Sequence, residues 1–106
     1  LVGEPQEVRR LGADVTGVLK RFAVTLACDG QVRAEGRGAN VLGSPLAAIA
    51  HLLAILVKQR PPMPLQANEL VTTGTLTPAL PIHVGETWST DLSGIALPGL
   101  SIQCVV

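Results

Sequence analysis

The chain has 106 residues, which suits one domain of residues 1–106, and its 47% hydrophobic and 15% charged residues are typical of a globular protein and exclude a disordered one. The formal net charge is zero, and Phe22 and Trp88 are the only aromatic residues. So few rings and so little positive charge argue against nucleic-acid binding.

All eight Lys and Arg residues lie in residues 1–60, while residues 61–106 hold three acids and no base. Cys28 and Cys104 are the only cysteines, and we expect both to be reduced packing residues. The longest apolar run, residues 46–57, is too short to span a bilayer, and no targeting signal is visible, so we expect a cytoplasmic protein without membrane contact. The start at Leu1, without an initiator Met, suggests a fragment or a processed chain.

A short strand at residues 1–2 and a loop up to residue 17 are expected first. Residues 19–28 then alternate between apolar and polar side chains, which predicts a half-buried strand. Asp29-Gly30 is a hairpin signal, and residues 31–37 alternate again. A strict two-residue turn would place Arg33 on the apolar face. One extra residue in the loop, or a bulge, would instead pair Leu26 with Ala34, and of these two we expect the longer loop.

A glycine-rich loop of residues 36–43 leads to Ser44-Pro45, an N-cap followed by proline at the first helical position. Apolar residues then recur at helical spacing until Pro61-Pro62, which predicts one main helix at about residues 45–59. We expect its apolar face to pack on the sheet through Leu46, Ile49, Leu53 and Leu56.

The remainder of the chain predicts three further strands. Residues 69–73 are rich in β-forming side chains, residues 88–92 follow a turn at Val84-Gly85, and residues 100–106 close the chain. A loop fills residues 74–81.

Neither a metal site nor a covalent nucleophile is visible in the sequence. The acids are scattered, and His51 and His83 stand alone, so no set of ligands converges on one point. Ser44 is explained by its capping role, and neither cysteine has a neighbouring base that would activate it. We therefore assign no catalytic and no metal-binding residue.

Two loops are the remaining candidates for binding. The segment GRGANVLGSP ends at a helix N-terminus, where anions are favoured, although a tight strand-to-helix turn explains it as well. The segment TTGTLTPALP at residues 72–81 places four threonines and a glycine directly after an expected strand. Hydroxyl and N–H groups of this kind can bind a carboxylate, although a Thr-rich strand end with a proline turn is an equally simple explanation.

Four segments together resemble the C-terminal half of the 2-keto-4-pentenoate hydratase and oxalocrotonate decarboxylase branch of the fumarylacetoacetate hydrolase superfamily. They are LVGEP at 1–5, GRGANVLGSPLAAIAHLL at 36–53, LVTTGTLTPALPIHVGETW at 70–88 and SGIALPGLSIQCVV at 93–106. The resemblance covers essentially the whole chain. It implies an α+β, mostly-β fold with a mixed, rolled sheet and few helices.

The resemblance also implies chemistry on a 2-keto acid, in which Mg²⁺ or Mn²⁺ favours an enolate-like species before water adds or carbon dioxide leaves. The family's loop over the substrate carboxylate matches this chain at Thr75 first, with Thr73 and Gly74 in support. The family's metal-binding carboxylates and catalytic lysine would precede Leu1. The family's Ala-Gly-Asp is here Ala67-Asn68-Glu69, and its later Pro-Gly-Asp is Val84-Gly85-Glu86.

Two interpretations follow. The chain is part of a hydratase-like enzyme that supplies the substrate loop without the metal, and is inactive alone; alternatively, it is a truncated, non-enzymatic binding or assembly module. Whichever holds, exposed sheet edges and apolar surface favour a homodimer. The expected ligand is a small 2-keto acid or another carboxylate.

Overall fold

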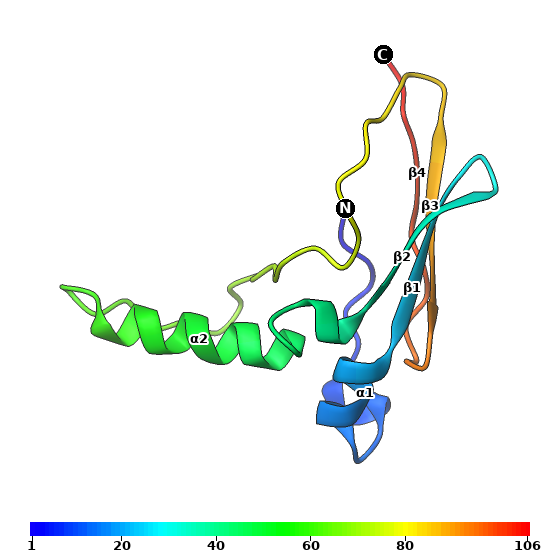
Figure 1. Cartoon of the computed structure of the whole chain (residues 1–106). Helices are drawn as coiled ribbons and strands as arrows, with labels where there is room; N and C mark the ends of the chain where they lie inside the picture. Colours follow the sequence, from blue (N-terminus) through cyan, green and yellow to red (C-terminus); the bar gives the residue numbers. More distant parts are fainter.

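The protein is described by a computed structural model of residues 1–106, which contains a four-stranded sheet, two α-helices and two short 3₁₀ helices. The strands are β1 (Ala23–Cys28), β2 (Gln31–Arg37), β3 (Thr87–Ser93) and β4 (Ser101–Gln103); the helices are α1 (Val15–Arg21) and α2 (Pro45–Lys58), with η1 (Val8–Leu11) and η2 (Gly38–Asn40). Figure 1 shows an L-shaped molecule whose upright part is the sheet and whose horizontal arm is α2. The α+β class expected from the sequence is confirmed.

The sheet has the order β2-β1-β3-β4, and every neighbouring pair is antiparallel. The expected mixed sheet is therefore wrong for this chain. Parallel pairing requires a crossover between strands in the same sheet, and here α2 and the long segment after it lead to β3, which pairs antiparallel with β1.

The β1–β2 hairpin has the predicted register but reaches it by a different route. Leu26 lies opposite Ala34, as expected, and Cys28 lies opposite Gln31 across a two-residue turn. Asp29 and Gly30 both have positive φ, at 49° and 81°, which suits the tight turn that matches strand twist. The extra residue is a bulge near Arg33, not a longer loop.

The segment before β1 is helical, which corrects the expected loop and the start of the expected strand at residue 19. Asp14 caps α1 by accepting a hydrogen bond from the backbone N–H of Gly17 at 3.1 Å, and its other oxygen accepts one from Arg21 at 2.8 Å. The pKa of Asp14 lies below its ordinary value because of the hydrogen bonds from Arg21 and then Gly17. Residues 1–2 are not a strand.

Helix α2 forms where the sequence predicts it and ends at Lys58. Ser44 accepts a hydrogen bond from the N–H of Leu46, and Pro45 occupies the first turn. At Gln59 the backbone becomes extended, before the Pro61-Pro62 pair.

The packing expected for α2 is wrong. Helix α2 points away from the sheet, and no residue of it is buried. Of the four residues expected on the sheet, Leu46 and Leu53 are 37% and 40% exposed, while Ile49 and Leu56 are only half-buried. The helix instead lies beside α1 and beside the segment that follows it, where the N–H of Met63 donates to the carbonyl of Leu56.

Two strand predictions in the second half of the chain also need correction. Residues 69–73 are not a strand, because no neighbouring strand pairs with them. β3 forms around the expected residues 88–92, after the turn in which Gly85 has a φ of 92°. β4 covers only Ser101–Gln103 of the expected residues 100–106.

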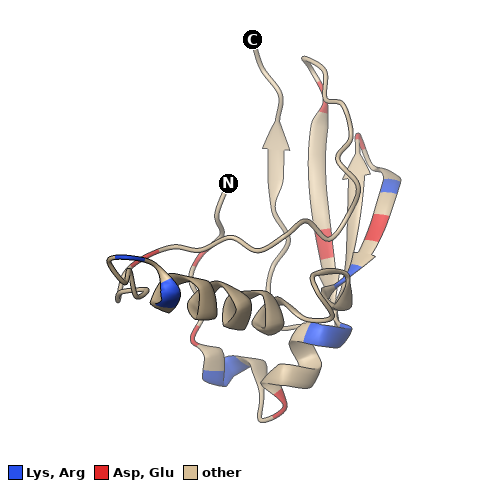
Figure 2. Cartoon of the chain, turned by 60° about the vertical axis from the view of Figure 1, so that its left-hand side comes forward, with Lys and Arg blue, Asp and Glu red and all other residues tan.

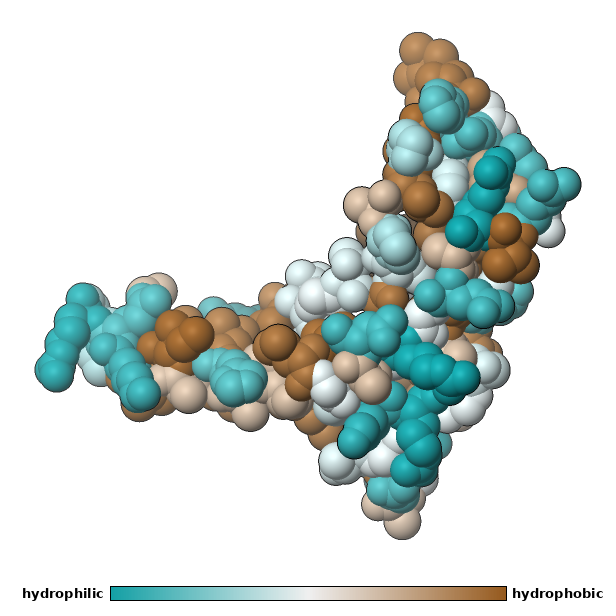
Figure 3. Space-filling model, in the orientation of Figure 1, coloured by the Kyte–Doolittle hydropathy of each residue, from teal (hydrophilic) through white to brown (hydrophobic).

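The core is small and lies on one face of the sheet. Only eight of 106 residues are buried, among them Phe22, Val24, Cys28 and Trp88. The accessible surface is 7764 Å², whereas a compact monomer of this size would expose about 5,600 Å². The radius of gyration is 15.8 Å against about 13 Å for a compact chain. Figure 3 shows hydrophobic residues spread along the arm and near the top of the sheet.

The stretch Gly38–Lys58 is, by length and composition alone, apolar enough to cross a membrane, although the sequence suggested only a shorter apolar run. Within it the α-helix itself has 14 residues, because the backbone at Ser44 is extended. A helix of that length spans about 21 Å, short of the roughly 30 Å of a bilayer core.

Candidate functional site

The two loops singled out in the sequence meet in the structure. The side-chain amide of Asn40 donates to the carbonyl oxygen of Leu76 at 3.0 Å, across 36 positions of sequence. At Gly36, on β2, a Cβ atom would lie 2.2 Å from the same carbonyl oxygen. Gly36 therefore has to be glycine for the threonine loop to approach β2 this closely.

The residues expected to hold a carboxylate are displayed on the surface of this loop. Thr73, Gly74 and Thr75 are all exposed, and neither threonine hydroxyl makes a hydrogen bond within the chain. None of the five hollows on the molecule is lined by these three residues. The loop therefore offers free donors but no walls that would enclose a ligand.

Acidic residues near the loop do not form a metal site. Glu69 is exposed and accepts a hydrogen bond from the N–H of Gln66 at 2.7 Å. No group of three or more His, Cys, Asp or Glu side chains comes together in the chain. The residues present therefore do not fit Mg²⁺ or Mn²⁺, which prefer about six oxygen ligands.

Glu86 is half-buried and engaged by three hydrogen-bonding groups. One oxygen accepts hydrogen bonds from the N–H of His83 at 2.8 Å and from the indole of Trp88 at 2.9 Å. Its other oxygen lies 3.1 Å from Nδ1 of His83. These contacts hold the pKa of Glu86 below its ordinary value, with the His83 N–H as the largest cause and the Trp88 indole next.

The cysteines and the remaining histidine show no sign of reactivity. Cys28 is buried and Cys104 is half-buried, and both are free thiols. Burial raises the pKa of Cys28, and the negative charges of Glu86 and Asp29 raise it further. His51 is exposed on α2. The charged side chains of the chain are spread over its outside, and Figure 2 shows that α2 carries charge only toward its C-terminal end.

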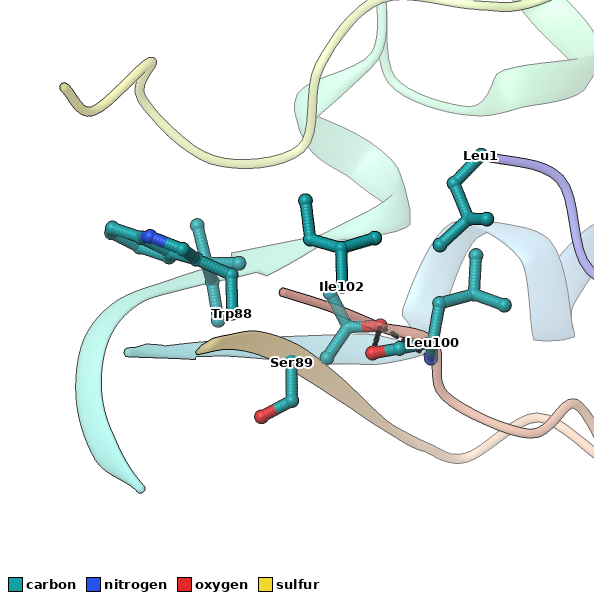
Figure 4. A pocket seen from close by; sticks show the side chains of 7 residues that line it. Leu1, Trp88, Ser89, Leu100 and Ile102 are labelled. Carbon is teal, nitrogen blue, oxygen red and sulfur yellow. Dashed lines mark hydrogen bonds between the residues drawn. The ribbon is translucent and has the colours of Figure 1, made fainter. Parts of the chain in front are cut away.

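A separate apolar groove lies on the sheet. It has a volume of about 200 Å³ and is lined by Leu1, Leu26, Trp88, Ser89, Thr90, Leu100 and Ile102. Figure 4 shows Leu1, Leu100, Ile102 and Trp88 along this groove, with Ser89 pointing the other way. The hydroxyl of Thr90 accepts a hydrogen bond from the N–H of Leu100 at 3.0 Å, which ties the chain before β4 to β3.

Asn40 is the residue at this site that sequence reasoning missed. It was assigned only to a flexible glycine-rich loop, because no periodicity or motif signals a contact with a residue 36 positions later. Its position in the 3₁₀ turn η2, directly after β2, allows its amide to reach the threonine loop.

We predict that Asn40→Asp loosens the threonine loop. A carboxylate of the same size cannot donate to the Leu76 carbonyl, so a hydrogen bond of about 1 kcal/mol is lost. Backbone ¹⁵N relaxation should show lower order parameters for residues 73–77 and unchanged values for β1 and β3. Unchanged values in the loop would mean that the packing on Gly36 holds it without Asn40.

Comparison with solved structures gives the class of fold. The chain superposes with a TM-score of 0.71 and 30% identity on 4-oxalocrotonate decarboxylase from Pseudomonas putida G7 complexed with calcium and acetate, over 82% of this chain and 32% of that one. The same decarboxylase complexed with magnesium and adipate matches with a TM-score of 0.71 and 29% identity, over the same shares. The chain thus has the fold of part of this enzyme.

Sequence comparison gives the particular relatives. The chain is 40% identical over 77 residues to a 2-keto-4-pentenoate hydratase of Burkholderia vietnamiensis (strain G4 / LMG 22486), and 36% identical to that of Paraburkholderia phymatum. Each match covers 73% of this chain and 29% of the relative. No protein-family model matches. The resemblance to hydratases and oxalocrotonate decarboxylases is confirmed, and the chain spans about three tenths of the length of these relatives.

Proposed function

We propose that this chain supplies the substrate-carboxylate loop, Thr73–Thr75, of a hydratase-like activity on a 2-hydroxy-dienoate or 2-keto acid in aromatic catabolism. The observation that carries the proposal is the exposure of two unengaged threonine hydroxyls on a loop that Asn40 of η2 holds by a hydrogen bond and that Gly36 of β2 allows to approach closely. The resemblance to 2-keto-4-pentenoate hydratases supports the class of substrate. Thr75 is the main donor, with Thr73 and the backbone of Gly74 in support.

In this proposal, the loop binds and orients one carboxylate by uncharged donors. Hydroxyl and N–H groups bind an anion although they carry no positive charge themselves. The negative charge that develops during the reaction is therefore stabilised by other groups. A divalent ion would have to be held by residues other than these 106, because the carboxylates here do not converge. The chain alone is therefore expected to be inactive, and the cytoplasm, where its thiols stay reduced, is the proposed setting.

A second function, a non-enzymatic binding or assembly module of the fumarylacetoacetate hydrolase superfamily, is favoured by one observation. The chain exposes roughly 2,000 Å² more surface than a compact monomer would, which suits a protein that is completed by association. The two functions differ in whether the threonine loop binds carboxylates.

The test is carboxylate binding followed residue by residue. Acetate or a 2-keto acid added to the ¹⁵N-labelled chain should shift the amide signals of residues 73–75, with a Kd in the millimolar range because no charge assists. Thr75→Val should weaken this binding at least several-fold, whereas Thr72→Val, a matched exposed threonine next to the loop, should not.

The same protein should not consume 2-hydroxypenta-2,4-dienoate, followed by its ultraviolet absorbance, with or without Mn²⁺. Metal-dependent turnover that Thr75→Val abolishes would overturn the claim that this chain lacks its metal ligands. Amide shifts that are absent, or equal in the Thr75→Val chain, would remove the carboxylate role and leave the assembly module.

A further inference from the structure

A hollow with charged residues lies beside Trp88, at the end of the sheet where β3 begins, and we call it the Trp88 hollow. Its volume is about 240 Å³. The residues that line it come from β2, from the segment that leads to β3 and from β3 itself; they are Arg33, Leu80, Pro81, His83, Glu86 and Trp88. The threonine loop contributes nothing to it, so the hollow is separate from the proposed carboxylate loop.

Two opposite charges line the Trp88 hollow without pairing. Arg33 is exposed and takes part in none of the chain's ion pairs. Glu86 pairs only with His83, at 3.1 Å from Nδ1. The Arg33 guanidinium and the Glu86 carboxylate are therefore too far apart for a direct ion pair, although both border the same space.

The surrounding backbone and side chains set the position of each charge. Arg33 lies at the bulge of β2, and a bulge interrupts the regular alternation of side chains and aims one of them differently. One oxygen of Glu86 is fixed by the N–H of His83 at 2.8 Å and by the indole of Trp88 at 2.9 Å. The other oxygen contacts only Nδ1 of His83, and a carboxylate oxygen has two lone pairs, so it can accept one more hydrogen bond.

The rest of the hollow is apolar. Leu80, Pro81 and Trp88 line it beside the two charged groups. Leu80 is 37% exposed, so an apolar group in the hollow would remove it from water. A small-molecule site typically combines apolar walls with a few polar groups that fix orientation. One cation, one anion and an apolar wall complement a ligand that carries both charges and an apolar group.

We propose that the Trp88 hollow binds a free α-amino acid with an apolar side chain, its carboxylate held by Arg33 and its ammonium group by Glu86. The planar guanidinium presents N–H donors in a fork that matches a carboxylate. The available oxygen of Glu86 accepts from the ammonium group, and the ligand's side chain covers Leu80 and Trp88. The inference goes beyond the proposed function and does not depend on the threonine loop.

The experiment follows the fluorescence of Trp88, which is the only tryptophan in a chain without tyrosine. Leucine is the probe, and it should change the emission with a Kd of about 1 mM. Isocaproate lacks the ammonium group of leucine and isoamylamine lacks its carboxylate. Each of these two analogues should bind at least about tenfold more weakly, because it leaves one charge of the hollow unmatched.

Variants of the two charged residues test their roles, with circular dichroism as a check of folding. Arg33→Gln and Glu86→Gln should each weaken leucine binding at least about tenfold. Arg37→Gln is the matched control, because Arg37 is also exposed on β2 and outside the ion pairs, but lines a different hollow. Both Arg37→Gln and Thr75→Val should bind leucine like the unmodified chain.

Three results would overturn the proposal. Equal affinities for leucine and isocaproate would show that Glu86 holds no ammonium group. Leucine binding that persists in Arg33→Gln, with isoamylamine bound equally well, would assign the signal to the apolar groove that Trp88 also lines. An emission that does not change at leucine concentrations far above the expected Kd would show that the hollow holds only solvent.

Discussion

Replacing Gly38 with alanine is expected to lower the free energy of unfolding by about 3 kcal/mol, the upper end of the usual range for overpacking. A Cβ atom at this position would lie 1.8 Å from the carbonyl oxygen of Leu19 and 2.8 Å from Cε1 of Phe22. The first contact is with backbone of α1, which cannot rotate away. The N–H of Gly38 also donates to the carbonyl of Phe22 at 3.0 Å, so the position cannot shift without losing that bond.

Chemical denaturation of Gly38→Ala beside Gly74→Ala tests this expectation. Gly74 has an unstrained backbone, and a Cβ there would lie 3.8 Å from Val41 Cγ1, an ordinary contact. The Gly74 variant should therefore change stability by no more than about 0.5 kcal/mol. Equal midpoints for the two variants would mean that α1 moves away from η2 at little cost.

Features set by neighbouring residues could be predicted from the sequence. Ser44-Pro45 and the helical spacing that follows define α2 to within one residue, because capping and proline geometry act locally. The pairing of Leu26 with Ala34 could also be predicted, because it keeps Arg33 off the apolar face. In the structure a bulge, and not a longer loop, produces this register. Helix α1 was missed because Gly17 was assigned to a loop, whereas its N–H is the donor that Asp14 caps.

Features set by distant residues could not be predicted. Residues 69–73 have the composition of a strand, but strand structure needs a partner, and no strand of this chain pairs with them. The prediction that α2 packs on the sheet was wrong for the same reason, because helical periodicity identifies an apolar face without indicating what covers it. At the candidate site, the Asn40–Leu76 contact joins two loops that only the fold brings together.

The extended shape of the chain accounts for these differences between prediction and structure. Strand-forming residues without a strand partner, a helix with an exposed apolar surface and a one-sided core all describe a chain whose sequence is suited to more contacts than it makes alone.

Replacing Trp88 with alanine should have the largest effect of any single substitution, a loss of about 3–5 kcal/mol in the free energy of unfolding. Trp88 is 8% exposed and lies opposite Cys28 on β1 and Ile102 on β4, so it joins three of the four strands. With only one other aromatic ring in the chain, no neighbour can fill the space. Thermal unfolding should show the domain of Trp88→Ala melted or nearly so at room temperature.

Trp88→Phe separates packing from the hydrogen bond that the indole donates to Glu86. Phenylalanine keeps most of the apolar contact, so Trp88→Phe should destabilise the fold far less than Trp88→Ala.

The pKa of Glu86 is lowered in the folded chain. This carboxylate therefore stabilises the fold above the ordinary glutamate pKa of about 4.3, and the stabilisation is lost as the pH falls through the lower folded pKa. Without the indole donor, the loss of stability on acidification should be smaller. Equal destabilisation by Phe and Ala at neutral pH would show that the hydrogen bond, and not the packing of the ring, holds the strands together.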